Sequence, residues 1–142
     1  MAIFVETAAT APSESGAYAL LVALDAPLRV RAGGRDATLA PARYVYCGSA
    51  KGPGGLAARL ARHMRREKRA HWHVDQLTRA GRVLGAWVFP GRSECEVNDA
   101  LAGFPTPVEG YGSSDCKRCR SHLRLLPNGA PAPFIQSRFR KG

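Results

Sequence analysis

Hydrophobic runs bounded by turn residues predict the strands of this chain. The apolar run over residues 17–24 has the length and composition of a buried strand. Residues 28–31 alternate between apolar and basic side chains and lead to Gly33-Gly34, which is typical of a hairpin. Further strands are expected over residues 42–47, 83–89 and 123–126, the last of them at the edge of a sheet.

Three helices are predicted between these strands. The first begins near Leu56, after a glycine-rich break at residues 48–55, and its apolar residues fall on one arc of a helical wheel. A second helix is expected over residues 71–79, and Ser93 with Glu96 forms a capping box that begins a third. This succession of hairpins, helices and strands predicts an α+β fold, in which helices flank a small, mostly antiparallel sheet.

The length of 142 residues suits one domain with a hydrophobic core. The small and polar residues 1–15 are interpreted as a flexible lead-in, residues 16–126 as the folded domain, and the proline-rich, basic residues 127–142 as a tail. No apolar run approaches the roughly 20 residues of a membrane helix, and the first residues lack the pattern of a secretory signal. We therefore expect a cytoplasmic protein that does not enter a membrane.

Positive charge changes this picture of an ordinary small domain. The chain has 21 Lys and Arg residues against 11 Asp and Glu residues, a formal net charge of +10. Its hydrophobic content of 45% excludes a wholly disordered chain. Such an excess is typical of proteins that bind a polyanion, so the expected partner is nucleic acid. The charge does not indicate an oligomeric state.

The segment from the strand at residues 42–47 into the first helix carries several groups suited to phosphate. Glycines before a helix leave its first N–H groups free for an anion, and Lys51 lies in the same turn. The spacing matches neither the nucleoside-triphosphate loop nor the dinucleotide motif, so we expect a phosphodiester site. In the alternative interpretation, the glycines serve only the turn. The helix adds a basic stripe formed by Arg59, Arg62, His63 and Arg66.

Short motifs along the chain resemble those of the GIY-YIG nucleases. Gly16-Ala-Tyr18 and Tyr46-Cys-Gly48 resemble the two halves of that signature, and Arg59 followed by His63 resembles the family's first helix. The resemblance covers roughly residues 16–126. It implies a GIY-YIG-like fold with an inserted hairpin, because the two half-motifs are unusually far apart.

A narrower set of motifs resembles a branch of that superfamily whose members occur alone or fused to an endonuclease-III-like repair protein. The set consists of Tyr44-Val-Tyr46, Gly48-Ser-Ala50, Arg62-His63, His71-Trp-His73, Glu94-Cys-Glu96, Gly112-Ser-Ser-Asp-Cys116 and Ser121-His-Leu123. This resemblance implies a role in DNA repair or processing and a repair-protein partner.

The resemblance implies a metal-dependent endonuclease that hydrolyses phosphodiester bonds in DNA. In such an enzyme Arg59 would contact the scissile phosphate, where a guanidinium can form paired hydrogen bonds. Glu96 would hold one Mg²⁺ or Mn²⁺ ion with water at the remaining positions, and Glu94 is the reserve ligand.

The tyrosines and the histidine would handle protons. Tyr18 or Tyr46 would position or deprotonate the attacking water, with nearby cations and the metal lowering the phenol pKa. His63 would relay a proton or bind phosphate. Each residue also has a structural interpretation, because strand tyrosines usually pack, Arg59 and His63 fit a solvated helix face, and a capping-box Glu96 needs no metal. A nucleic-acid-binding module without catalytic turnover is therefore the alternative function.

Four cysteines in a chain without a secretory signal indicate reduced thiols or a metal site. Cys116, Cys119 and His122 supply part of a zinc site, and Cys95 would be the fourth ligand if the loop folds back. Reduced structural thiols are the default interpretation, zinc is the alternative, and a zinc-stabilised interaction domain is a third functional hypothesis. Basic residues in this loop and around the first helix are expected to contact the nucleic-acid backbone. They are Lys51, Arg62, Arg66, Lys117 and Arg118.

Overall fold

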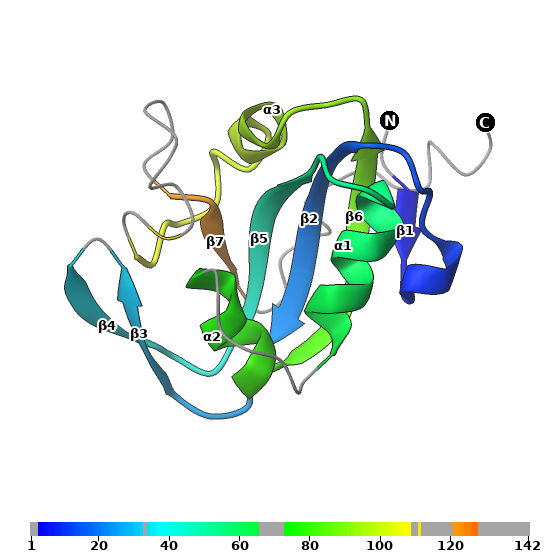
Figure 1. Cartoon of the computed structure of the whole chain (residues 1–142). Helices are drawn as coiled ribbons and strands as arrows, with labels where there is room; N and C mark the ends of the chain where they lie inside the picture. The colour runs from blue at the N-terminus through cyan, green and yellow to red at the C-terminus, as the bar shows by residue number, and fades with distance from the viewer. Residues whose placement is uncertain (1–2, 33, 66–72, 109–110, 112–120, 128–142) are drawn as a thin grey trace.

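The computed structural model describes residues 3–32, 34–65, 73–108, 111 and 121–127, and Figure 1 shows their arrangement. Five strands form one antiparallel sheet in the order β1-β6-β2-β5-β7. They are β1 (Ile3–Val5), β2 (Gly16–Ala23), β5 (Arg43–Ala50), β6 (Arg82–Pro90) and β7 (Leu123–Leu126). A second sheet pairs β3 (Leu28–Ala32) with β4 (Arg35–Leu39). The helices are α1 (Gly55–Met64), α2 (His73–Ala80), α3 (Glu94–Asp99) and a short 3-10 helix, η1 (Ala8–Thr10). The predicted α+β class is confirmed.

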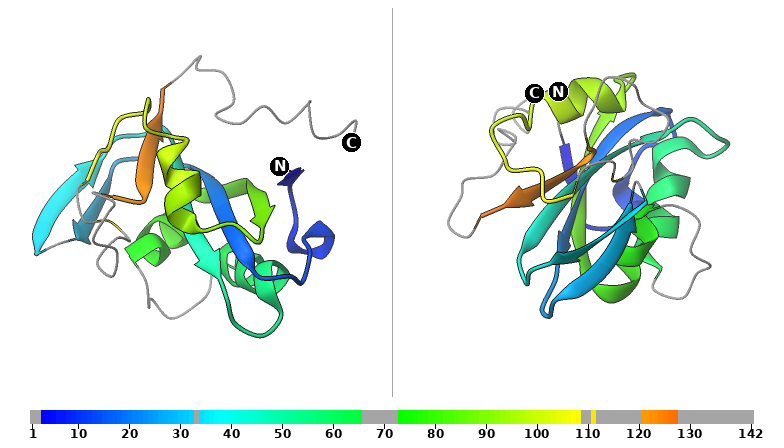
Figure 2. Two further views of the ribbon diagram at one scale, coloured as in Figure 1. Left: turned by 90° about the horizontal axis from the view of Figure 1, so that it is seen from above. Right: turned by 90° about the vertical axis from the view of Figure 1, so that its left-hand side faces the viewer.

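The five-stranded sheet buries side chains on both faces, and helices cover each face. In Figure 1, α1 and α2 lie in front of the sheet and α3 lies above it, and Figure 2 shows the same layers from two other sides. The core between the sheet and the helices α1 and α2 contains Tyr18, Leu20, Tyr46, Leu56, Leu60 and Leu77. The core on the side of α3 contains Ala17, Ala19, Cys47, Val97 and Leu101. Because strand residues alternate between faces, Tyr18 and Tyr46 are brought to the same side.

Residues 3–15 form part of the fold. Ile3–Val5 pairs with β6 as the first strand of the sheet. Further along, the carbonyl oxygens of Pro12 and Glu14 accept hydrogen bonds from α1, and that of Ser15 accepts one from Gly91. The prediction that ordered structure begins at Gly16 is therefore wrong. The short run at residues 3–5 is stabilised by pairing with a distant strand, which its own sequence does not reveal.

The strand β5 continues past the expected break at Gly48. The register pairs Gly48 with Tyr18 of β2, and a Cβ atom at Gly48 would lie 2.4 Å from the Tyr18 hydroxyl oxygen. Glycine is therefore required here by the close approach of the Tyr18 ring. Gly48 does not end β5, because β5 stays paired with β2 as far as Ala50 and this pairing supplies the backbone hydrogen bonds.

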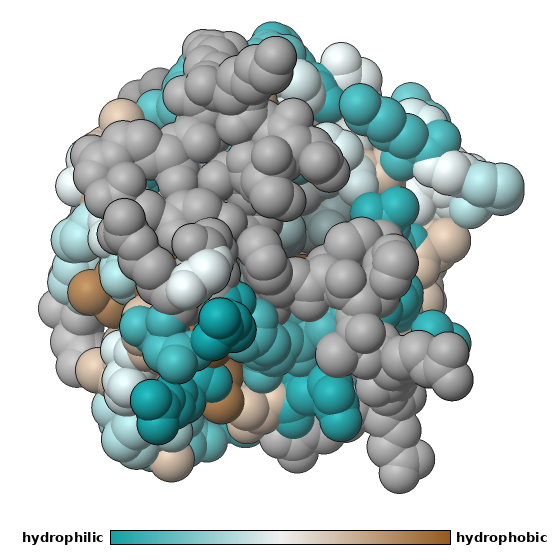
Figure 3. Space-filling view, turned by 60° about the vertical axis from the view of Figure 1, so that its left-hand side comes forward, coloured by the Kyte–Doolittle hydropathy of each residue, from teal (hydrophilic) through white to brown (hydrophobic). Residues whose placement is uncertain are grey.

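The predicted hairpin is present and packs against α2. Its inner side buries Val30 and Leu39 against the main core. The Gln76 side chain accepts a hydrogen bond from the Arg31 backbone N–H at 2.9 Å and donates one to the Arg31 carbonyl at 3.2 Å. The side chains of Arg29 and Arg31 are exposed on the outer side. Figure 3 shows a largely hydrophilic surface with small apolar spots on the side of the molecule that carries the hairpin.

The predicted capping box at the start of α3 is confirmed. The Ser93 hydroxyl accepts a hydrogen bond from the Glu96 N–H, and the Ser93 N–H donates one to the Glu96 carboxylate. The predicted edge strand is also present as β7, and α2 matches the second predicted helix. Among the described residues, none of the helices has both the length and the apolar character needed to cross a membrane.

Candidate active site

A tyrosine of β2 and a histidine of α1 meet in the core of the domain. The Tyr18 hydroxyl oxygen lies 2.6 Å from Nε2 of His63, a hydrogen-bonding distance between residues 45 positions apart in the sequence. Both side chains are almost wholly buried, with 2% and 0% of the residue exposed. The motif tyrosine and the helix histidine, which the sequence suggested only separately, are thus in direct contact.

Arg59 joins this pair from one helical turn earlier. Its Nη1 donates a hydrogen bond to the Ser49 carbonyl oxygen of β5 at 2.8 Å. Its guanidinium also interacts with the Tyr18 hydroxyl. Residues four apart on a helix lie on the same face, so Arg59 and His63 approach Tyr18 together. The side chain of Arg59 is only partly buried, which leaves one side of this cluster open to solvent.

The tyrosines of this site remain protonated at neutral pH. Burial raises the pKa of Tyr18 well above its usual value, the negative charge that Tyr46 would carry adds to the rise, and Arg59 offsets only part of it. Burial likewise raises the pKa of Tyr46. Arg59 lowers the pKa of both phenols, as predicted, but desolvation is the larger effect and the net shift is upward.

A second pair of aromatic rings extends the cluster along the same face. Tyr46 and Tyr111 make an edge-to-face contact, with ring centroids 6.2 Å apart and an interplanar angle of 80°. Both are buried, and burial raises the pKa of Tyr111 as well. Sequence reasoning missed Tyr111 because it stands in a glycine-rich loop outside any periodic pattern.

The two acidic residues at the start of α3 have different surroundings. Glu96 is exposed, and its carboxylate accepts hydrogen bonds from the Ser93 N–H and from Arg92, which lower the Glu96 pKa. Glu94 is partly buried, and its charge contributes to the raised pKa values of both Tyr18 and Tyr46. The Glu94 charge therefore acts on both tyrosines, whereas the Glu96 carboxylate is held in the helix cap. The preference for Glu96 over Glu94 as the site carboxylate is not supported by this geometry.

Comparison with known proteins places the chain in a family. A family model described as "Domain of unknown function DUF123" matches residues 17–141. The chain belongs to this family. No curated protein and no solved structure matches it. The DUF123 match contains Tyr18, Tyr46, Arg59, His63 and Glu94 and extends past the predicted domain boundary at residue 126.

The first turn of α1 in this DUF123 domain does not offer its N–H groups to a ligand. Leu56 N–H donates to the Glu14 carbonyl at 2.9 Å, and Ala57 N–H donates to the Pro12 carbonyl at 2.8 Å. Gly55, with φ of +55°, lies so close to this segment that a Cβ atom there would clash with backbone carbonyls. The expectation of a phosphate site at this helix N-terminus is wrong, because the preceding segment already caps the helix. The glycines serve the turn.

Arg62 is held by a carboxylate that sequence reasoning did not consider. Its guanidinium donates two hydrogen bonds to Asp75 of α2, at 2.8 and 2.9 Å, and these bonds raise the Arg62 pKa. The Asp75 side chain is completely buried. Arg62 therefore joins α1 to α2, and its contact with nucleic acid stays a prediction. Lys51 remains an exposed basic residue in the turn.

The other predicted binding residues have to be considered separately. Arg66, Cys116, Lys117, Arg118 and Cys119 lie outside the described residues. Within the described ranges, no group of three or more His, Cys, Asp or Glu side chains is placed to hold one metal ion. Two donors do lie together, because a Glu94 carboxylate oxygen is 3.6 Å from Nδ1 of His122. A partly exposed carboxylate fits Mg²⁺ or Mn²⁺, which accept oxygen ligands and retain water.

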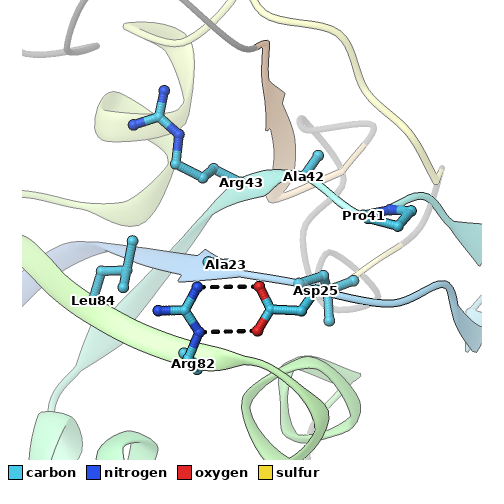
Figure 4. Close-up of a pocket in the computed structure, with 8 residues that line it drawn as sticks. Ala23, Asp25, Pro41, Ala42, Arg43, Arg82 and Leu84 are labelled. Atoms are coloured by element: carbon cyan, nitrogen blue, oxygen red, sulfur yellow. Dashed lines mark hydrogen bonds and ion pairs between the residues drawn. The ribbon is translucent and has the colours of Figure 1, made fainter.

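An open pocket occupies the opposite end of the sheet (Figure 4). Arg82 and Asp25 form a paired contact on one side of it, and Arg43 lies on the other. The adjoining Ala23 is five residues from Tyr18 along β2, a distance of about 17 Å in an extended strand. This pocket contains none of the motif residues and is distinct from the candidate active site.

Proposed function

We propose that this DUF123 domain is a metal-dependent endonuclease of the GIY-YIG type that hydrolyses phosphodiester bonds in DNA. The observation that carries the proposal is the convergence of Tyr18, Arg59 and His63 at one end of β2, with 2.6 Å between the phenol oxygen and the imidazole nitrogen. A cation beside a hydrogen-bonded proton acceptor is the arrangement that phosphodiester hydrolysis needs.

The exposed and buried members of the site take different roles in this proposal. Arg59 and Glu94 are partly exposed, so a bound substrate can reach both side chains. Arg59 binds the scissile phosphate and stabilises the charge that develops on its oxygens. A divalent cation held by Glu94 would supply further charge stabilisation at the phosphate.

The raised pKa of Tyr18 favours a proton relay over a free phenolate. As water attacks phosphorus, Tyr18 takes a proton from the water and passes its own proton to Nε2 of His63, which becomes an imidazolium. The leaving oxygen of the broken P–O bond then takes up a proton from solvent. In this scheme the phenol never carries a full negative charge, which its buried position disfavours.

Nucleic acid is the proposed substrate because the chain carries a net charge of +10 and its exposed basic residues include Lys51, Arg29 and Arg31. The choice of DNA over RNA rests on the motif resemblance. Cytoplasmic location, action in repair and a repair-protein partner belong to the same proposal. Action in repair and the repair-protein partner derive from the motif resemblance described above.

Cleavage of labelled single-stranded, duplex and branched DNA, with RNA in parallel, tests the proposal. With Mg²⁺ or Mn²⁺ present, Arg59→Ala and Glu94→Gln are expected to reduce cleavage by roughly 100-fold or more, since each removes a charge used at the reacting phosphate. Glu96→Gln is the matched control two residues away and is expected to cleave like the unmodified chain. Equal cleavage by Glu94→Gln and the unmodified chain would contradict the assignment of Glu94.

The deep burial of Tyr18 and His63 favours a second candidate function. Side chains this enclosed can serve packing alone, which would leave a nucleic-acid-binding module without turnover. That module would yield no products with any divalent metal, while its affinity for DNA would fall steeply with salt as counterions are released. Under this hypothesis Arg59→Ala weakens binding modestly and to the same extent for all sequences.

A further inference from the structure

His122 has a fixed position and an unusual environment. Its backbone N–H donates to the Tyr111 carbonyl at 2.9 Å, and its carbonyl accepts from the Cys47 N–H at 2.8 Å, so the residue is anchored from two sides. Its side chain is 1% exposed. Neither ring nitrogen has a hydrogen-bond partner within the described part of the chain. A buried polar atom in this condition costs free energy unless some other group satisfies it.

Within the described residues, the Glu94 carboxylate lies close to this ring. Its Oε2 lies 3.6 Å from Nδ1 of His122, which is too long for a hydrogen bond. Two ligand atoms about 2.1 Å from one metal ion are separated by about 3.4 Å in a tetrahedral site and about 3.0 Å in an octahedral one, so a small side-chain shift would bring these two atoms to that separation. Glu94 begins α3 and His122 immediately precedes β7, so the fold brings together two donors that are 28 positions apart.

We propose that Glu94 and His122 are joint ligands of one divalent transition-metal ion, Mn²⁺ in the first instance, through Oε2 and Nδ1. The inference rests on the proposed function in that it assigns the second protein ligand of the same metal. The Glu94 side chain is 33% exposed, which gives the ion a route from solvent and room for water ligands. An imidazole ligand favours Mn²⁺, Co²⁺ or Zn²⁺ over Mg²⁺, which takes oxygen donors.

Metal binding by the full chain, measured without nucleic acid, tests this assignment. The chain is titrated with Mn²⁺ and the bound ion is followed by electron paramagnetic resonance, with pulsed measurements to detect a coordinated nitrogen. One bound Mn²⁺ with a nitrogen coupling is expected. His122→Gln is expected to abolish the coupling and to weaken binding at least roughly tenfold, since even indirect supports of a metal site cost that much.

Glu94→Gln is a second test at a partly exposed position, where loss of folding is not a concern, and it is expected to weaken Mn²⁺ binding similarly. Glu96→Gln is the matched control and is expected to retain both the affinity and the nitrogen coupling. Thermal unfolding followed by circular dichroism establishes that each variant is folded.

Three results would overturn the assignment. They are a bound Mn²⁺ without nitrogen coupling, a coupling that persists in folded His122→Gln, and unchanged affinity in Glu94→Gln. Replacing Mn²⁺ with Co²⁺ adds a check on the cysteines, because a thiolate-to-cobalt absorption band would assign the ion to Cys ligands instead. Intact metal binding without cleavage would reject only the proposed nuclease function, and cleavage with an oxygen-only metal site would reject only the His122 ligand.

Discussion

Two arginine–aspartate pairs in this domain have nearly the same geometry and very different surroundings. Arg62 contacts Asp75 through two hydrogen bonds of 2.8 and 2.9 Å, and Arg82 contacts Asp25 through two of 3.0 and 3.1 Å. The side chains of the first pair are 21% and 0% exposed, and those of the second are 56% and 72% exposed. Contact geometry alone therefore does not indicate what either pair contributes.

The difference lies in what remains if one partner is removed. Asp75 is enclosed by the core. Without Arg62, its carboxylate would remain a buried charge and would lose two strong hydrogen bonds. Asp25 and Arg82 are both hydrated, so water and salt compensate for either partner. Because Arg62 adjoins His63 in α1, the buried pair also fixes the helix that carries the candidate active site.

The largest expected effect is that of Arg62→Met, which keeps much of the side-chain volume and removes the charge. The free energy of unfolding should fall by about 3–5 kcal/mol, because the Asp75 carboxylate stays buried without its main partner. Urea unfolding at neutral pH measures the change. A loss below about 1 kcal/mol would show that water reaches Asp75 in the folded state, and the contrast between the two pairs would no longer hold.

A second expected effect is a loss of stability at alkaline pH caused by the buried, neutral tyrosines. Burial raises the pKa values of Tyr18, Tyr46 and Tyr111 above that of an unfolded tyrosine, about 10. Above pH 10 the unfolded chain therefore releases protons that the folded chain keeps, so stability is present below this pH and falls as the pH rises. Each tyrosine should contribute a loss of about 1.4 kcal/mol at pH 11.

Tyr46→Phe isolates one of these contributions. Urea unfolding at pH 8 and pH 11 should show a smaller alkaline loss in the variant than in the unmodified chain, and tyrosinate absorbance should appear mainly on unfolding. If tyrosinate absorbance instead develops near pH 10 in the folded protein, the tyrosines are hydrated and the proposed relay loses its basis.

The smallest expected effect is that of Arg82→Met. The exposed pair is screened, so the midpoint of thermal unfolding should change by about 2 °C or less. Differential scanning calorimetry at low and high salt provides the measurement, with Arg62→Met run alongside for comparison. A salt-independent drop as large as that of Arg62→Met would mean that exposure is a poor guide to the role of an arginine–aspartate pair here.

Local patterns in the sequence predicted most of the fold. The apolar run at residues 17–24, the hairpin at Gly33-Gly34 and the capping box at Ser93 are each encoded within a few residues, and all three appear in the structure. The strand β1 and the extension of β5 past Gly48 were not predictable in this way, because both depend on pairing with strands distant in the sequence.

The candidate site shows a similar limit. Motif spacing placed Tyr18, Arg59 and His63 in suitable elements, and the structure brings these three together. The choice between Glu94 and Glu96 depends on how α3 docks, which no local pattern encodes. The same reasoning explains why Arg62, on the same basic stripe as Arg59, was not recognised as the partner of a buried carboxylate on another helix.

The backbone contacts between residues 12–14 and the head of α1 affect how the domain can be shortened. A version beginning at Gly16, where the recognisable motifs start, would strip two carbonyl acceptors from Leu56 and Ala57 and remove the strand that borders β6. The first turn of the arginine-bearing helix would then fray. Attempts to trim this protein to its recognisable motifs should therefore retain the preceding residues from Ile3 onward.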